Sequence, residues 1–354
     1  MPAAVRTLQT FRKIEMRTAS PTTPPSGLLE LGDRRVLLGQ CLGRGSIASV
    51  YRAVLEAPNG IGRPVACKVF GILASEEYEL VVDALAQTVR RATCILHPNV
   101  ASTYELCEGA LGHQPFILSE LVVGTTLRHV LDRGAQRGRR MPLDLALFIG
   151  TEIAEGLNAA RVAKGPDGFN LGITHLDLSA RDVLLSWHGE VKVSDFELGG
   201  ARQVASAVRS LSAIARRADT MAPEIARGDG GDTRSDVFSL GIILREMLIG
   251  PRFAKGVTDG EALRLARDGF VQPITFEPHL PEEVRRILDR TLEVEPERRF
   301  PHSGALAYEL RRVALSLGVG DARFFLKSML EKELGEERSD ATVPHEIGKK
   351  RRRR

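Results

Sequence analysis

The sequence contains no long uncharged hydrophobic run. The best candidate, residues 237–249, is interrupted by Arg245 and Glu246 and is too short to span a bilayer. The N-terminus also has no apolar segment of the kind that makes a signal peptide. These absences predict a cytoplasmic protein without a transmembrane segment.

Cysteine is scarce, and its four positions share no metal-ligand spacing. They are Cys41, Cys67, Cys94 and Cys107. Three of them lie within apolar runs, which indicates reduced, buried thiols rather than a metal site.

The positive charge of the chain is concentrated at its end. The net charge is +4, but residues 349–354 supply six positive charges, so the first 348 residues together carry −2. Such a basic run could bind nucleic acid or an anionic surface through counterion release. No aromatic residues interleave with it to stack on bases, which favours a merely solvated terminus.

The length of 354 residues allows two packed lobes. We expect a flexible arm over residues 1–32, because residues 20–27 are rich in proline, serine and threonine and offer nothing to bury. A small lobe is predicted over residues 33–122, where strand patterns surround one helical pattern. The expected strands are 35–42, 49–55, 64–70, 104–107 and 115–121, and the expected helix is 74–96.

Beyond residue 122 the hydrophobic spacing becomes helical, which predicts a large helical lobe over residues 123–317. The expected helices are 143–162, 233–248, 260–269, 281–292 and 303–317. A C-terminal helix is predicted within residues 318–336. Its apolar residues favour docking onto the large lobe, and a partner-binding helix is the alternative. Residues 337–354 are predicted to form a basic flexible tail.

Four motifs carry the candidate chemistry. Gly43 and Gly45 allow backbone amides to approach phosphate oxygens, and Lys68 follows on a predicted strand. Asp177 and Asp195 lie eighteen residues apart, each behind an apolar strand. Acidic residues at this spacing are what a site needs to hold a magnesium nucleotide and to orient a hydroxyl group.

In this order, from about residue 35 to about residue 317, the motifs resemble those of the bacterial Hanks-type serine/threonine protein kinases. The resemblance implies an α+β, bilobal protein kinase fold, with ATP and Mg²⁺ as cofactors. It further implies that the partner is a protein substrate or a signalling protein. The catalytic residues implied are Asp177 and Lys68, and the implied metal ligands are Asp182 and Asp195. Nucleotide binding is implied for Gly43, Gly45, Val50, Ala66, Lys68, Glu120 and Val122.

The chain departs from this family's pattern on the small-lobe helix. Kinases hold the strand lysine with a helix glutamate, but the corresponding position is Thr88, with Gln87 beside it. Glu79 or Asp83 could substitute only if the helix shifted. The alternative is that Lys68 is a solvated strand lysine.

Further departures affect the catalytic loops. Leu176 replaces the arginine that senses a phosphorylated activation loop, Ser179 replaces a lysine near the transferred phosphoryl group, and Asp182 replaces a metal-binding asparagine. Glu197 replaces a glycine. If that position needs a positive φ, Glu197 costs on the order of 1–2 kcal/mol and restricts the segment.

Three further residues indicate the fold rather than activity. Arg299 is expected to pair with Glu224, and Asp236 is expected to hydrogen-bond the catalytic-loop backbone. Together, these patterns predict a divergent serine/threonine kinase with attenuated activity. The alternative is a pseudokinase that binds ATP or a partner without phosphoryl transfer.

Overall fold

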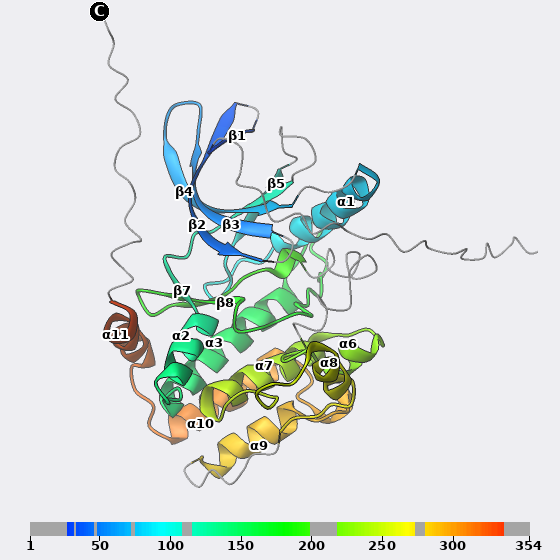
Figure 1. The fold of residues 1–354 in the computed structure, drawn as a ribbon, viewed down its shortest axis with the longest axis vertical. Coiled ribbons are helices and arrows are strands. Elements are labelled where there is room, and N and C mark those ends of the chain that lie inside the picture. Colours follow the sequence, from blue (N-terminus) through cyan, green and yellow to red (C-terminus); the bar gives the residue numbers. More distant parts are fainter. Residues whose placement is uncertain are drawn as a thin grey trace, which may run out of the picture.

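The protein has two lobes, one built on a sheet and the other mainly helical (Figure 1). The computed structural model describes residues 27–31, 33–45, 48–71, 75–107, 115–198, 218–272 and 280–335. The α+β, bilobal architecture predicted from the sequence is therefore confirmed.

The small lobe contains a six-stranded antiparallel sheet with the order β1-β2-β3-β4-β6-β5. Its strands are β1 (Leu28–Leu31), β2 (Arg34–Arg44), β3 (Ala48–Glu56), β4 (Gly62–Phe70), β5 (Thr103–Cys107) and β6 (Phe116–Ser119).

The first strand corrects the predicted boundary of the N-terminal arm. Residues 28–31, which the sequence placed within the arm 1–32, pair with β2 as β1. The physical reason is burial, since Leu29 is buried in the same cluster as Val36. Gly27 accepts a hydrogen bond from Leu38 N, and residues 1–26 and 32 of the predicted arm lie outside the described residues.

One face of the sheet packs on an apolar core, and the other face carries the candidate site residues. Val65 and Cys67 on β4 face a buried apolar cluster, together with Leu118 on β6. Because side chains alternate along a strand, Ala66 and Lys68 face the opposite side. The strand register places Val50 directly beside Lys68 and places Ser119 beside Ala66. This second face is the one that carries the candidate nucleotide-binding residues.

All four cysteines are free, and their burial differs. Cys67 and Cys107 are buried, whereas Cys41 and Cys94 are half-buried. Burial raises the pKa of the Cys107 thiol to about 12, so this side chain remains a neutral, apolar part of the small-lobe core.

Helix α1 (Ser75–Ala92) packs against the sheet and reaches toward the large lobe. Its buried residues Leu85 and Val89 form a cluster with Phe70, Ile117 and Leu198. Leu198 belongs to the large lobe, so α1 contacts both lobes through apolar side chains.

The large lobe combines helices with a small antiparallel sheet of the order β7-β8-β9. The strands are β7 (Gly124–Thr126), β8 (Val183–Ser186) and β9 (Val191–Val193). The helices are α2 (Leu127–Gln136), α3 (Leu143–Val162), α6 (Pro223–Arg227), α7 (Thr233–Leu248), α8 (Asp259–Arg267), α9 (Glu282–Thr291), α10 (Ser303–Ser316) and α11 (Ala322–Leu334). None of the helices in the described part of the chain is long and apolar enough to cross a membrane.

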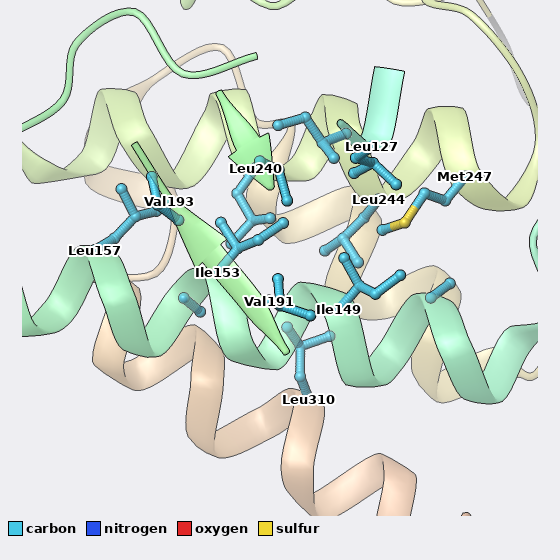
Figure 2. Packing of buried hydrophobic residues seen from close by; sticks show 14 of the residues in the cluster. Leu127, Ile149, Ile153, Leu157, Val191, Val193, Leu240, Leu244, Met247 and Leu310 are labelled. Atoms are coloured by element: carbon cyan, nitrogen blue, oxygen red, sulfur yellow. The ribbon is translucent and has the colours of Figure 1, made fainter. Parts of the chain in front are cut away.

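The largest apolar core among the described residues lies in the large lobe (Figure 2). Ile153 of α3 and Leu240 of α7 meet in this core, and Val193 of β9 packs beside them. Full burial of one such side chain contributes roughly 1.5–3 kcal/mol. The core therefore gives a firm base to β8 and β9, whose ends carry the acidic loops.

Helix α11 docks onto this lobe. Leu326, Leu330 and Leu334 are buried in the same core, and Glu333 forms ion pairs with Arg137 and Arg139. Of the two alternatives given by the sequence, docking and a partner-binding helix, the structure has the docked one. Phe324 and Phe325 remain largely exposed on the outer side of the helix.

Candidate nucleotide and catalytic site

Lys68 lies at the centre of the candidate site. Its amine is 2.6 Å from Asp195 Oδ1 and 2.8 Å from Glu197 Oε1, and its side chain is only 8% exposed. The alternative of a solvated strand lysine is therefore wrong. A residue of the small-lobe sheet instead contacts two carboxylates that follow β9 in the large lobe.

The electrostatics keep the Lys68 amine positively charged. Burial opposes the ammonium form, but the charges and hydrogen bonds of Asp195 and Glu197 outweigh it and raise the pKa of Lys68 above its ordinary value of 10.5. A cation that is held next to Asp195 is suited to bind phosphate oxygens beside a metal ion.

Glu197 forms a contact with Lys68 that the sequence analysis did not predict. Its carboxylate bonds Lys68 with one oxygen and accepts a hydrogen bond from Thr103 Oγ1 with the other, at 3.2 Å. Asp83, which could substitute only if α1 shifted, has an exposed side chain and does not take this position. The Glu79 side chain lies outside the described residues.

The backbone of the Asp195-Phe196-Glu197 segment corrects a second expectation. Among the described non-glycine residues, only Leu176 and Asp195 have positive φ, at 57° and 73°. Leu198 N donates to Asp195 O at 3.0 Å and closes a 3₁₀ turn over Phe196–Leu198. The left-handed residue is therefore Asp195, a residue type that tolerates this conformation, and the strain anticipated at Glu197 does not arise.

The loop that carries the candidate catalytic residue Asp177 is held by a buried acid from α7. Asp236 accepts hydrogen bonds from the backbone amides of His175 at 2.8 Å and Leu176 at 2.7 Å, as predicted. The His175 ring bonds the carbonyl oxygen of Ser194 at 2.9 Å and meets Phe196 edge-on, with ring centroids 5.0 Å apart. His175 therefore has a structural role, and it couples the two acidic loops.

Two further candidate acids, Asp177 and Asp182, lie on the loop that begins at His175. Asp182 is buried, and its backbone oxygen accepts from Ser194 N at 2.8 Å, immediately before Asp195. Asp182 Oδ2 accepts from Ser179 through the amide at 2.9 Å and the hydroxyl at 2.8 Å. Asp177 is half-buried two residues after His175. The loop therefore brings Asp182 close to the Asp195 segment.

The predicted nucleotide-binding residues Glu120 and Val122 follow β6. The Glu120 amide donates to Ser102 O at 2.8 Å, and the Glu120 carboxylate forms an ion pair with Lys192 at 3.0 Å. Val122 is half-buried. These contacts fix the connection between the lobes at Glu120.

The glycine turn joins β2 to β3. Gly43 pairs with Val50, and Gly45 N donates to Ala48 O at 2.8 Å. Both glycines are exposed, whereas Val50 and Ala66 are half-buried on the Lys68 face of the sheet. The residues predicted for nucleotide binding therefore line one face of the small lobe and the connection below it.

The donor set fits a magnesium nucleotide. Asp182 and Asp195 offer the hard oxygen ligands that Mg²⁺ prefers, and Lys68 offers a cation for phosphates. Within the described part of the chain, no three His, Cys, Asp or Glu side chains converge to hold a metal ion by themselves. Mg²⁺ usually binds one or two carboxylates together with substrate phosphates.

A buried ion pair supports the far side of the large lobe. Arg299 Nη1 and Nη2 bond Glu224 Oε1 and Oε2 at 2.7 and 2.8 Å, as predicted. Ser235 donates to the same carboxylate at 2.7 Å.

The basic run 349–354, for which nucleic acid or an anionic surface was considered as a partner, lies outside the described residues.

Comparison with known proteins agrees with this geometry. The chain is 29% identical over 301 residues to the tyrosine-protein kinase MasK of Myxococcus xanthus, covering 84% of this chain and 46% of that protein. It is 28% identical over 295 residues to the serine/threonine-protein kinase PknB of Mycobacterium leprae, covering 82% of this chain and 44% of that protein.

The serine/threonine-protein kinase PknA of Mycobacterium tuberculosis is 30% identical over 278 residues, covering 77% of this chain and 60% of that protein. The chain thus spans only about half the length of these relatives. Residues 36–307 match the family described as protein tyrosine and serine/threonine kinase. The chain belongs to this protein kinase family.

Proposed function

We propose that the protein binds ATP with Mg²⁺ and transfers the γ-phosphoryl group to a protein hydroxyl at an attenuated rate. The observation that carries this proposal is the contact between Lys68 and Asp195 at 2.6 Å. It joins the candidate phosphate-binding cation of one lobe to the candidate metal ligand of the other.

Each candidate residue has a distinct role in this proposal. Lys68 neutralises charge on the α- and β-phosphates, and the backbone at Gly43 and Gly45 covers them. Asp182 and Asp195 hold Mg²⁺, which neutralises the charge that develops on the β- and γ-phosphate oxygens. Asp177 orients the substrate hydroxyl and accepts its proton.

The adenine is proposed to lie between the small-lobe sheet and the connection to the large lobe. Val50 and Ala66 supply the apolar surface. Since the Glu120 amide already donates to Ser102 O, we assign the adenine hydrogen bonds to the Glu120 carbonyl and the Val122 backbone.

The attenuation follows from Ser179. A lysine at this position would place a cation near the transferred phosphoryl group, where removal of one stabilising donor costs on the order of 100-fold in rate. Asp182 also adds negative charge beside the phosphates, whereas an asparagine would not. Leu176 cannot pair with a phosphate, so we expect no activation through phosphorylation of residues 199–217.

The second candidate is a pseudokinase that binds ATP or a signalling partner without transfer. The hydrogen bond from Ser179 to Asp182 supports the pseudokinase, because the serine hydroxyl donates to the carboxylate and not to a phosphoryl group. We assign serine and threonine rather than tyrosine as substrate residues by similarity to the Hanks-type kinases. The protein substrate is part of the proposal, since the match covers only 44% to 60% of the relatives' own length.

Nucleotide binding is tested by thermal unfolding with ATP, in the presence of Mg²⁺ or of a chelator. The proposal expects a higher melting temperature with Mg²⁺ and ATP together than with either alone. If ATP raises the melting temperature in neither condition, the protein is not a nucleotide-binding kinase.

Phosphoryl transfer is tested separately with γ-labelled ATP and a generic protein substrate. The kinase proposal expects slow labelling that Asp177→Asn abolishes. Nucleotide binding without labelling selects the pseudokinase, and labelling that persists in Asp177→Asn would identify a contaminating kinase.

A further inference from the structure

The carboxylate of Glu197 is held on both sides. Oε1 lies 2.8 Å from the Lys68 amine, and Oε2 accepts the hydroxyl of Thr103 at 3.2 Å. The Glu197 side chain is only 4% exposed, and Thr103 is buried on β5. The position of this carboxylate is therefore set by β4, β5 and the 3₁₀ turn.

Burial makes this contact specific. An unpaired carboxylate or ammonium group is costly inside a protein, so each buried charge constrains where the other can lie. Lys68 is the cation that pairs with Glu197, and Thr103 satisfies the remaining oxygen. These contacts restrict the Lys68 amine to one place, which is the property that a phosphate-binding lysine requires.

Helix α1 supplies no comparable group among its described side chains. The hydroxyl of Thr88 donates to its own helix, to Ala84 O at 3.1 Å and Leu85 O at 3.0 Å. Asp83 is exposed. The helix contacts the turn that carries Glu197 through apolar residues, with Leu85 and Val89 against Leu198.

We propose that Glu197 is the positioning residue for Lys68 and takes the role of the helix glutamate whose position on α1 is occupied by Thr88. This inference rests on the proposed nucleotide-binding function. The anchor then belongs to the segment that also carries the metal ligand Asp195. As a consequence, Lys68 does not depend on a charged contact from α1, and movement of that helix does not switch the site.

The opposite role would be an inhibitory clamp, in which Glu197 competes with phosphate for Lys68. The geometry favours the anchor, because an ammonium group has three N–H donors. Lys68 can keep its bond to Glu197 while its other donors serve phosphate oxygens and Asp195 turns to the metal ion.

The first test is the dissociation constant of ATP with Mg²⁺, measured by equilibrium dialysis for the wild type and four variants. Glu197→Gln is nearly isosteric and should weaken binding by at least about tenfold. Glu197→Gly should weaken it as well, although it makes the segment match the family pattern. Glu197→Asp should retain more affinity than Glu197→Gln.

The matched control is Asp83→Asn on α1, which should bind as the wild type does. Equal or tighter binding by Glu197→Gln would overturn the proposal and would identify Glu197 as an inhibitory clamp. A loss of affinity in Asp83→Asn comparable to that in Glu197→Gln would also overturn it, because the helix would then supply the anchor.

A second measurement is made without nucleotide, so that it stays informative if the proposed function fails. An ion-paired, buried ammonium group exchanges slowly with water and gives an NMR signal in ¹⁵N-lysine-labelled protein, which Lys68→Met assigns. The signal should broaden or vanish in Glu197→Gln and weaken in Thr103→Val, which removes only the supporting hydroxyl. An unchanged Lys68 signal in folded Glu197→Gln would overturn the anchor.

If the wild type binds no nucleotide but shows the protected signal, the proposed function fails and the anchor stands. If the wild type binds ATP but Glu197→Gln changes neither affinity nor signal, the anchor fails and the proposed function stands.

Discussion

Ser179 donates two hydrogen bonds to a single oxygen of Asp182, from its amide at 2.9 Å and its hydroxyl at 2.8 Å. The serine thus orients a candidate metal ligand from the position where a serine/threonine kinase has a lysine. The loop thus holds the candidate metal ligand Asp182 in place, whereas position 179 itself carries no cation.

Replacing Ser179 by lysine should therefore raise the rate of phosphoryl transfer. We expect an increase of about tenfold or more in kcat for Ser179→Lys, because the added ammonium group stabilises charge that develops during transfer. The affinity for ATP should change less than kcat. Initial rates with γ-labelled ATP at saturating nucleotide measure this.

The control for this change is Ser179→Ala, which loses the hydroxyl bond to Asp182 and adds no charge. It should show no gain in kcat. If Ser179→Lys transfers no faster than the wild type while remaining folded, the attenuation does not come from this position.

The pair of Glu224 and Arg299 should contribute strongly to stability at neutral pH. The Arg299 side chain is fully buried, and removing one partner leaves an uncompensated charge. We expect Glu224→Gln to lower the free energy of unfolding by about 3–5 kcal/mol. Urea denaturation at pH 7 measures the loss.

This contribution should depend on pH in a defined direction. Burial opposes the charged form of Glu224, but hydrogen bonds from Arg299 and Ser235 outweigh it and lower the pKa of Glu224 below its ordinary value of 4.5. A depressed pKa stabilises the fold above the ordinary value, and the stabilisation is lost as pH falls through the folded value. The difference in the free energy of unfolding between the wild type and Glu224→Gln should therefore become smaller below pH 4.5.

Glu297→Gln is the control for this pair, since Glu297 also contacts an arginine but its side chain is 70% exposed. It should change the stability by no more than about 0.5 kcal/mol. An equal loss of stability in Glu224→Gln and Glu297→Gln would contradict the importance of the buried pair. So would a difference in stability between the wild type and Glu224→Gln that does not vary with pH.

Helix α11 should behave as part of the folded large lobe. Leu326 is fully buried against the core, whereas Phe324 on the same helix is 58% exposed. We expect Leu326→Ala to cost about 2–5 kcal/mol, because it leaves a cavity, and Phe324→Ala to cost about 0.5 kcal/mol or less. Thermal and urea unfolding compare the two, and similar small effects would mean that α11 is not docked in solution.

The longer helices could be predicted well because their hydrophobic spacing is sustained. The bounds of α3 (Leu143–Val162) and α7 (Thr233–Leu248) agree with the sequence-based ranges. The helix α2 and the short strands β7 and β8 were not predicted. The apolar strand expected before Asp195 is β9, whereas the one expected before Asp177 is absent from the described residues. Strands of three or four residues are too short to show a period, and pairing between distant segments decides them.

The site was predictable as far as individual residues have a fixed spacing. Lys68, Asp195, Asp236 and the pair Glu224–Arg299 could be placed by their motifs. The contact between Lys68 and Glu197 could not, because the family's motif has a glycine at position 197 and assigns that position no contact with the lysine. The sequence does contain a signal, since an acid appears at a glycine position in a chain that lacks the helix acid.

The central claim is that Lys68 and Asp195 form one site for a magnesium nucleotide. The most direct measurement is the affinity for labelled ATP in Mg²⁺ and in a chelator, for the wild type and Asp195→Asn. We predict saturable binding that Mg²⁺ strengthens in the wild type, and little or no strengthening by Mg²⁺ in Asp195→Asn. Wild-type binding that is absent, or an Mg²⁺ effect that is equal in both proteins, would contradict the account.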